Sequence, residues 1–407
     1  MKRHAYRSME SRLSLNRRDF FRVGGAAGAV AGIGLLAGRS LAAAQEQAPA
    51  PPAKPATNIA DALKFPRTKT SLPGPFPGRV VEVRDPASVS GAKVDAAAVR
   101  AMFAKGMRAL TGKDLVSSFG LFFTKDDVVG IKVNPVGPGL ISTRLEVVDA
   151  VIDWLAAGGL PRRNIVIWDR FDYMLKDAGF TPERYPGVSF EGLQTMDEAA
   201  AEGKTKDNSR WLRPDGTHIS ADNFEKDVFY WADVEGPKDE AYLNQHVFNG
   251  KHSYFGKLLT RKLTKIINVP VFKNTGNAIS MATKNIGYGA VCNTNRLHKP
   301  LFLDVCVEVP AFPVLRDKWV LTVTDGIKGQ YDGGPGPEAK FIYDQGALFF
   351  GTDPFAMDLV CHNLLVAKRK EMGVKVNEHP QFTEYLRYAE RLGLGVADPA
   401  KIAHIKA

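Results

Sequence analysis

The chain has 407 residues, of which 44% are hydrophobic, and this composition predicts a globular protein rather than a disordered tail or a coiled coil. Its formal net charge of +10 is unevenly spread, because residues 1–44 hold eight Lys or Arg and only two Asp or Glu, which leaves +4 for the rest. So small an excess, without basic runs interleaved with aromatic residues, argues against a nucleic-acid partner.

The first 44 residues resemble a twin-arginine export signal. Arg17 and Arg18 precede two phenylalanines, a Gly/Ala-rich apolar run over 23–38 and small residues ending at Ala44. The resemblance implies that the translocation machinery exports the folded protein to the periplasm, so that membrane contact is confined to export. The apolar run is shorter than the roughly 20 residues of a comfortable bilayer span, and the small residues favour cleavage. A retained single-pass anchor remains the alternative.

The next segment, residues 45–77, is rich in Ala and Pro, without apolar periodicity, and is predicted to be an extended linker. A single folded domain is expected over 78–407. It begins with a predicted strand, RVVEVRD, at 79–85. An amphipathic helix is predicted to follow over 94–112.

Strands and helices alternate in the next part of the domain. The apolar run DDVVGIKVNP predicts a strand buried on both faces, and NIVIWDR predicts another. A helix is predicted between them, with Thr143 and Glu146 at the spacing of a capping box, and a short helix is predicted after them over 173–180. This order predicts an α/β fold, a largely parallel sheet with helices on both faces.

Residues 192–254 are polar, charged and rich in turns, and we interpret them as an insertion between the two halves of the domain. The α/β pattern resumes with three apolar segments that predict strands: KLTKIINVPVFKN, KWVLTVTDG and ALFFGTDP. Two further helices are predicted at about 354–370 and 379–393.

Polar side chains follow these predicted strands at the points where the strands end. In an open parallel sheet the carboxyl ends of the strands share one edge, where ligands bind. Because Asp and Asn also cap helices and form turns, each of these side chains taken alone has a structural explanation. The structural explanation is clearest after the last predicted strand, where Asp353 directly precedes a proline. A lysine that ends a buried strand has no such role. The residues at these ends are Lys132, Asn134, Asp169, Lys273, Asn274, Asp325 and Asp353.

The segment VFKNTGNAISMATKNIGYG, residues 271–289, places a second Lys-Asn pair, Lys284 and Asn285, shortly after the first. Its small side chains allow close backbone approach to a ligand and its lysines supply positive charge. A small carboxylate or phosphate is the complementary ligand. The alternative is a tightly packed loop whose lysines face solvent.

The metal and cysteine signals are weaker. Asp325, Asp332 and Asp353 offer oxygen ligands that suit Mg²⁺ or Ca²⁺, so a divalent metal is a candidate cofactor. The three cysteines have no C-x-x-C spacing, which argues against an iron–sulfur cluster. Cys292 and Cys306 can form a disulfide in an oxidising compartment or be small buried hydrophobic residues. The glycine-rich run over 331–340 lacks the spacing of a phosphate-binding loop.

Several motifs, in order, resemble the family of domain of unknown function 362: GIKVN, IVIWDR, ATKNIGYG, VTDGIKGQYDGGPGP and GTDPFAMD. The resemblance covers about 128–365, and a ferredoxin-like segment found in some members is absent. Many members read Lys-Thr-His where this chain has Lys273, Asn274 and Thr275, so a histidine is missing at that point. The positions that the resemblance marks are Lys132, Asn134, Asp169, Lys273, Lys284, Asn285, His298, Asp325, Gly326 and Asp353.

Together these observations lead us to expect a periplasmic enzyme that holds a small anion at the strand ends, with or without a metal. Lys273 and Lys284 are the expected anion ligands, Asp169 and Asp325 the expected acid/base groups or metal ligands, and His298 a proton carrier. The alternative is a non-catalytic protein for ligand binding or cofactor maturation in the same crevice. The sequence alone does not decide whether the protein is an enzyme.

Overall fold

The computed structural model of the chain describes residues 53–196, 209–235, 247–248 and 250–407. The export signal and the first part of the linker lie outside these residues. Residues 53–407 form one compact unit. Among the described residues, no helix is both long enough and apolar enough to cross a membrane.

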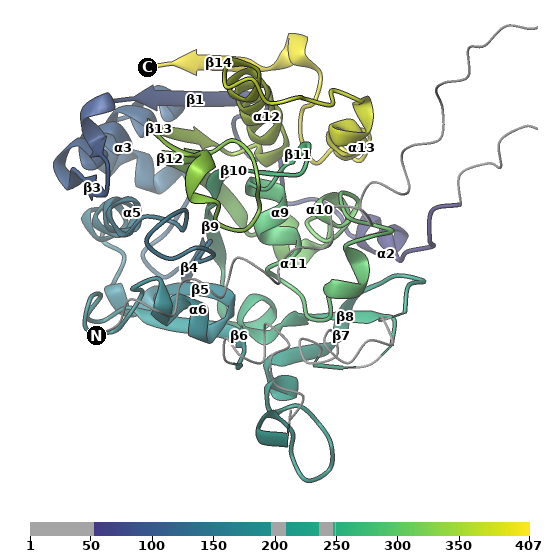
Figure 1. The fold of residues 1–407 in the computed structure, drawn as a ribbon. Coiled ribbons are helices and arrows are strands. Elements are labelled where there is room, and N and C mark those ends of the chain that lie inside the picture. The colour runs from purple at the N-terminus through teal and green to yellow at the C-terminus, as the bar shows by residue number, and fades with distance from the viewer. Residues whose placement is uncertain (1–52, 197–208, 236–246, 249) are drawn as a thin grey trace, which may run out of the picture. The chain divides into compact units, whose positions relative to one another are not determined.

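The unit is built on a sheet of ten strands in which the main order is β14-β1-β13-β12-β9-β4-β5-β6 (Figure 1). Every neighbouring pair along this order is parallel except the two pairs that involve β13. The predicted α/β class with a largely parallel sheet is therefore confirmed. The strands are β1 (Arg79–Arg84), β4 (Val129–Val133), β5 (Ile165–Phe171), β6 (Ser189–Gln194), β9 (Lys265–Val269), β10 (Val271–Thr275), β11 (Ala278–Ile279), β12 (Trp319–Gln330), β13 (Ile342–Gly351) and β14 (Ala403–Lys406).

Helices cover both faces of this sheet and bury two hydrophobic cores. One core lies under α3, α5 and α6, and the other lies under α9, α10, α12 and α13 (Figure 1). Because successive strand residues point to opposite faces, each buried strand supplies side chains to both cores. The helices are α2 (Ile59–Leu63), α3 (Ala96–Thr111), α4 (Leu115–Ser118), α5 (Leu145–Ala157), α6 (Asp172–Asp177), α9 (Ala282–Gly287), α10 (Val305–Glu308), α11 (Pro313–Arg316), α12 (Pro354–Glu371) and α13 (Glu384–Arg391).

Local sequence explains the ends of the first long helix, α3. The Asp95 side chain accepts hydrogen bonds from the backbone N–H groups of Ala97 and Ala98, which the helix itself leaves unpaired. At the other end Gly112 adopts φ +72°, the left-handed conformation that glycine reaches without a steric penalty.

Two expected elements differ in detail. Thr143 does not cap α5: its hydroxyl accepts from Asn134 N at 2.8 Å and donates to Val269 O at 2.8 Å, which ties two strands together instead. The strand expected over 262–274 is two strands, because Pro270 has no N–H to give to a ladder. Both parts pair with β12.

The described part of the polar segment at 192–254 contains a separate two-stranded sheet. Its antiparallel strands are β7 (Phe224–Trp231) and β8 (His252–Gly256). The first residues of the segment belong to β6 and so to the main sheet. A short antiparallel pair, β2 (Val89–Ser90) and β3 (Lys93–Val94), precedes α3.

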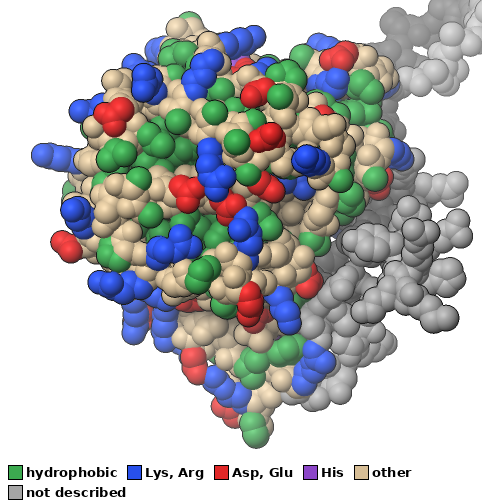
Figure 2. All heavy atoms as spheres, turned by 90° about the vertical axis from the view of Figure 1, so that its left-hand side faces the viewer, with side chains coloured by type: hydrophobic (Ala, Val, Ile, Leu, Met, Phe, Trp, Pro, Cys, Tyr) green, Lys and Arg blue, Asp and Glu red, His purple; other side chains and the backbone are tan. Residues whose placement is uncertain are grey.

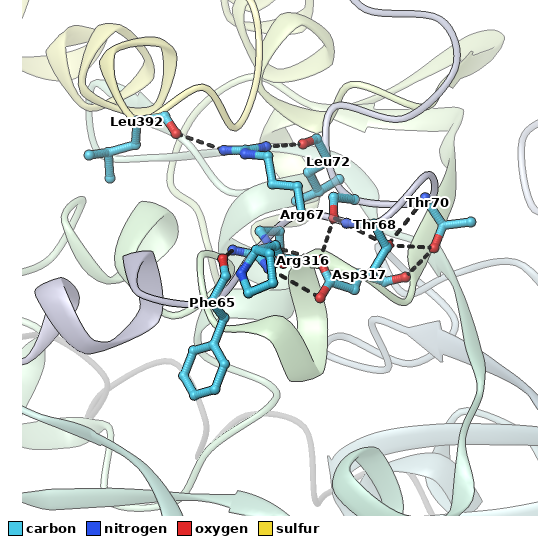
Figure 3. A network of polar contacts seen from close by, with 10 residues as sticks. Phe65, Arg67, Thr68, Thr70, Leu72, Arg316, Asp317 and Leu392 are labelled. Atoms are coloured by element: carbon cyan, nitrogen blue, oxygen red, sulfur yellow. Dashed lines mark hydrogen bonds and ion pairs between the residues drawn. The ribbon is translucent and has the colours of Figure 1, made fainter.

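The described part of the linker, residues 53–77, does not extend away from the body as expected. Arg316 donates to Phe65 O at 3.2 Å and to Pro66 O at 2.8 Å, and Leu72 N donates to Arg316 O at 2.9 Å (Figure 3). Asp317 beside it accepts from the hydroxyl of Thr70 through its backbone oxygen at 2.7 Å. These contacts hold the segment along the body as a strap.

Charged side chains on the face shown in Figure 2 are mixed, with Lys and Arg interspersed among Asp and Glu rather than gathered in one basic patch. That face adds nothing in favour of a nucleic-acid partner.

Candidate functional site

Three side chains form a row across the centre of the sheet. Lys132 on β4 stands in register with Trp168 on β5 and with Asn268 on β9. The row faces α9, because the neighbours of Lys132 along β4, Ile131 and Val133, belong to the opposite core. The expected buried strand thus carries one charged residue into the interior.

Lys132 is 1% exposed, and its ammonium group is fully paired. It donates to Val133 O at 2.8 Å and to Asn285 Oδ1 at 3.1 Å, and it forms an ion pair with the Asp169 carboxylate. Burial lowers the pKa of Lys132, and the Asp169 carboxylate opposes this change. Three acceptors match the three N–H bonds of an ammonium group, so the geometry fits a charged lysine.

Gly289 makes room for this lysine. A Cβ at this position would lie 2.4 Å from Asn285 O and 2.4 Å from Lys132 Cε, closer than such atoms approach. The glycine at the end of the NIGYG motif is therefore required by packing against the site.

Asparagine side chains connect Lys132 to the second lysine, Lys273 on β10. Lys273 Nζ donates to Asn134 Oδ1 at 3.0 Å, and Asn134 Nδ2 donates to Asn285 Oδ1 at 3.2 Å. Asn285 Nδ2 in turn donates to Asn268 Oδ1 at 2.8 Å. One member of each Lys-Asn pair of the sequence, Lys273 and Asn285, thus joins Lys132 in one hydrogen-bonded network.

The beginning of α9, which carries Lys284 and Asn285, is fixed by Asp358 on α12. Its carboxylate accepts from Ala282 N at 2.9 Å and Thr283 N at 3.0 Å, so it caps the helix from outside. Burial raises the pKa of Asp358 to about 6. A side chain distant in sequence therefore positions the second Lys-Asn pair.

Lys273 is buried in a positively charged environment. It is 1% exposed, and its Asn134 contact is with a neutral acceptor. Burial, followed by repulsion from Lys284, lowers the pKa of Lys273 to about 7, against the attraction of Asp169. Within the described residues, Asp169 is the one carboxylate that forms an ion pair with any of the three lysines.

Lys284 is partly exposed and lies against aromatic rings. Its Nζ is 5.6 Å from the centre of the Tyr288 ring and 5.4 Å from that of Phe302, with Ser280 Oγ at 3.4 Å. Burial lowers the pKa of Lys284. His298 lies beside the same rings, with its ring centre 4.4 Å from that of Tyr288 and the two ring planes tilted by 44°. Although His298 as a residue is exposed, loss of hydration around its ring, followed by the Lys284 charge, lowers its pKa.

Arg170 adds a further buried cation at the end of β5. It is 7% exposed, its guanidinium carbon lies 4.7 Å from the centre of the Phe171 ring, and it donates to the Thr294 hydroxyl. Burial lowers the pKa of Arg170 to about 10, and Asp169 is among the groups that oppose this change. We call Lys132, Asn134, Asp169, Arg170, Lys273, Lys284 and Asn285 the basic cluster.

The remaining expected ligand, Asn274, points away from the basic cluster. Its Oδ1 accepts from Gly334 N at 2.9 Å and its Nδ2 donates to Gly276 O at 3.0 Å. A Cβ on Gly334 would lie 2.1 Å from Asn274 O, so the glycine-rich run packs directly on this residue. Asn274 holds that loop in place.

The three aspartates expected as metal ligands lie apart from one another. Asp325 accepts from Arg144 N at 2.7 Å and Ile327 N at 3.0 Å, so it holds the start of α5, and burial raises its pKa to about 6. Asp332 forms an ion pair with Arg369 at 3.0 Å. Among the described residues, no group of three or more His, Cys, Asp or Glu has a geometry that could hold a metal.

The expectation that Asp353 joins the shared edge is wrong. It follows β13, which runs antiparallel to its neighbours, so it lies at the opposite edge of the sheet. There its carboxylate caps α12 through Phe355 N and Ala356 N and accepts from Gly78 N and Val396 N. Burial raises the pKa of Asp353 to about 6.

All three cysteines are free and buried, so Cys292 and Cys306 do not form a disulfide in this structure. Cys292 Sγ accepts from Tyr254 N at 3.2 Å. Two cavities of about 240 and 280 Å³ lie away from the basic cluster, one between α12 and α13 and one between α6 and β6.

Sequence reasoning missed Asn268, Asp358 and Arg170 as site residues. Asn268 carried a signal, since a polar residue inside an apolar strand needs a buried partner. Asp358 stands in the GTDPFAMD motif but looked like an ordinary helix residue. The pairing partner of either was not visible in a single sequence.

The fold and the site define an α/β protein with a buried basic cluster at the carboxyl ends of parallel strands. Within it, residues 214–363 belong to the family described as Domain of unknown function (DUF362), whose model matches that range. The match includes Lys273, Lys284 and Asn285 but not the first half of the sheet. No significant match was found among curated proteins or solved structures.

Proposed function

We propose that this protein is a periplasmic enzyme that binds a small carboxylate or phosphate anion at the basic cluster. The observation that carries the proposal is the unbalanced charge around Lys273. A protonated Lys273 offers three N–H donors, and the described residues supply one acceptor, Asn134 Oδ1. An anionic ligand supplies both the missing acceptors and the missing negative charge.

Two features favour an enzyme over the alternative of a non-catalytic binding protein. The lowered pKa of Lys273 is a property of catalytic lysines. Residues 53–407 form one compact unit rather than two lobes, whereas a solute receptor closes two lobes around a hinge.

Binding is tested by titrating the purified protein with inorganic phosphate and with oxalate in a calorimeter. We expect Lys284→Met to weaken binding by about 10-fold or more, because a hydrogen bond to a charged group contributes about 1.5–3 kcal/mol. Lys113→Met is the matched control, since Lys113 is exposed and distant in sequence from every member of the cluster. Equal affinity of all three proteins for both anions would refute an anion site at the cluster.

The compartment is tested independently of the ligand. Substituting Arg17 and Arg18 together by lysine keeps the charge of the signal but removes its arginine pair. We expect the variant to remain in the cytoplasmic fraction while the unchanged protein is recovered from the periplasm. Recovery of both proteins from the periplasm would refute export by the twin-arginine route.

A divalent metal as cofactor stays a prediction, which elemental analysis of the periplasmic protein checks.

A further inference from the structure

The amine of Lys273 occupies a position that suits a nucleophile. It lies in the middle of the short strand β10 and is 1% exposed, so its surroundings exclude water. One neutral oxygen, Asn134 Oδ1 at 3.0 Å, orients the nitrogen. Asn134 is itself fixed by Asn285, so the nitrogen is held by a chain of rigid amide groups.

The charges around this amine favour its unprotonated form. Lys132 and Lys284 both repel a proton on Lys273, and the nearby carboxylate, Asp169, is already paired with Lys132. With a pKa of about 7, Lys273 at pH 7 has roughly a thousand times the unprotonated fraction of a surface lysine. A buried lysine beside a second cation is an arrangement that activates amines for attack on carbonyl carbon.

The second cation is placed to bind the other end of a substrate. Lys284 is partly exposed, and in the described residues it has no carboxylate partner. Ser280 Oγ beside it offers a further polar contact at 3.4 Å, and the rings of Tyr288 and Phe302 border its ammonium group. Asn134, which contacts Lys273, is also partly exposed. A substrate would therefore approach Lys273 from solvent past Lys284 and Asn134.

We propose that Lys273 forms an imine with a small 2-oxo acid whose carboxylate binds Lys284. This inference rests on the proposed anion site and names its substrate class, an acid with a carbonyl group next to the carboxylate. A phosphate or a simple carboxylate would fill the same charge requirement but would offer no carbon for the amine to attack.

The chemical step is balanced without an oxidant or a reductant. The Lys273 nitrogen lone pair forms a bond to the carbonyl carbon, and the carbonyl π electrons move to oxygen, which takes up a proton. The nitrogen loses a proton, and the resulting hydroxyl leaves as water after protonation from solvent. The immediate product is an iminium ion, which becomes the neutral imine when the nitrogen gives its second proton to solvent, with one water released for each C=N bond formed.

The experiment traps this imine in the full-length protein. The protein is incubated with pyruvate or glyoxylate, the two smallest probes of the class, and sodium cyanoborohydride, which gives a hydride to the imine carbon and fixes a secondary amine. We expect a single reduced adduct by intact mass, and peptide mapping should place it on Lys273. Lys273→Met should lose the adduct, and Lys113→Arg should retain it.

Two further probes separate this inference from the proposed function. Acetone has the carbonyl but no carboxylate and should label Lys273 at least tenfold more slowly; L-lactate has the carboxylate but no carbonyl and should slow labelling by pyruvate. If L-lactate or oxalate binds the cluster while neither oxo acid labels Lys273, the imine is refuted and the anion site stands. If no acid binds, both proposals fail. Labelling of Lys113 at the same rate as Lys273 would also refute the inference.

Discussion

The ion pair between Lys132 and Asp169 yields a prediction whose size can be worked out from the structure. In Asp169→Asn, Lys132 keeps Val133 O and Asn285 Oδ1 and loses its one carboxylate. Removing one partner of a buried ion pair leaves an uncompensated charge and costs about 3–5 kcal/mol. A large domain loses about 2 °C of melting temperature per kcal/mol, so we expect a decrease of about 6–10 °C.

The assay is a double-mutant cycle measured by urea unfolding. Lys132→Met alone should also destabilise the protein, since it leaves Asp169 unpaired, but the double variant should lose less free energy of unfolding than the sum of the two. We expect a coupling energy of at least about 2 kcal/mol. Additivity within about 0.5 kcal/mol would refute the reasoning, because it is the result for residues that do not interact.

A surface ion pair provides the control for this cycle. Arg100 and Asp153 lie 2.8 Å apart, but their side chains are 49% and 55% exposed. Asp153→Asn should change the free energy of unfolding by no more than about 1 kcal/mol, the usual limit for exposed pairs.

Three other predictions concern packing, protonation and the strap. Gly289→Ala should lower the free energy of unfolding by about 1–3 kcal/mol, because the added methyl group would overpack against Lys132. Gly120→Ala is the control, because the space around its Cβ is open. Equal stability of the two variants in thermal unfolding would contradict the close packing at Gly289. Lys273 has a pKa of about 7 in the folded protein and near its ordinary 10.5 in the unfolded chain, so between these pH values the folded state binds fewer protons. The free energy of unfolding, compared with that of Lys273→Met, should therefore rise with pH across this window, by at most about 1.4 kcal/mol per pH unit. Urea unfolding at several pH values measures this difference, and a difference that does not change with pH would refute the prediction. Arg316→Ala should release the strap and speed its cleavage in limited proteolysis, followed by N-terminal sequencing, and an unchanged cleavage pattern would contradict the anchoring role.

The sequence predicted much of the cluster because strand geometry is regular. A lysine that ends an apolar run is expected at the carboxyl end of a strand, and in a parallel sheet the carboxyl ends of neighbouring strands lie together. This reasoning placed Lys132, Asp169 and Lys273 in one neighbourhood. The close backbone approach to a ligand that the small residues before Lys284 predict is still a prediction. Their roles in binding or catalysis stay predictions.

The same reasoning failed where the result depended on the direction of a strand or on a partner distant in sequence. The run that became β13 has no feature that distinguishes an antiparallel strand from a parallel one, so Asp353 was assigned to the wrong edge. Thr143 has capping-box spacing, but two strand contacts compete for its hydroxyl and prevail. Long-range partners of this kind, such as Asp358 for α9, leave no local pattern to detect.

The position of β1 has a consequence for synthesis of the chain. This first strand pairs with β13 on one side and with β14, which ends at Lys406, on the other. Both partners emerge from the ribosome long after β1. This edge of the sheet is therefore completed only after β14 has been synthesised, and loss of residues 403–406 would expose the backbone of β1 to pairing with other chains.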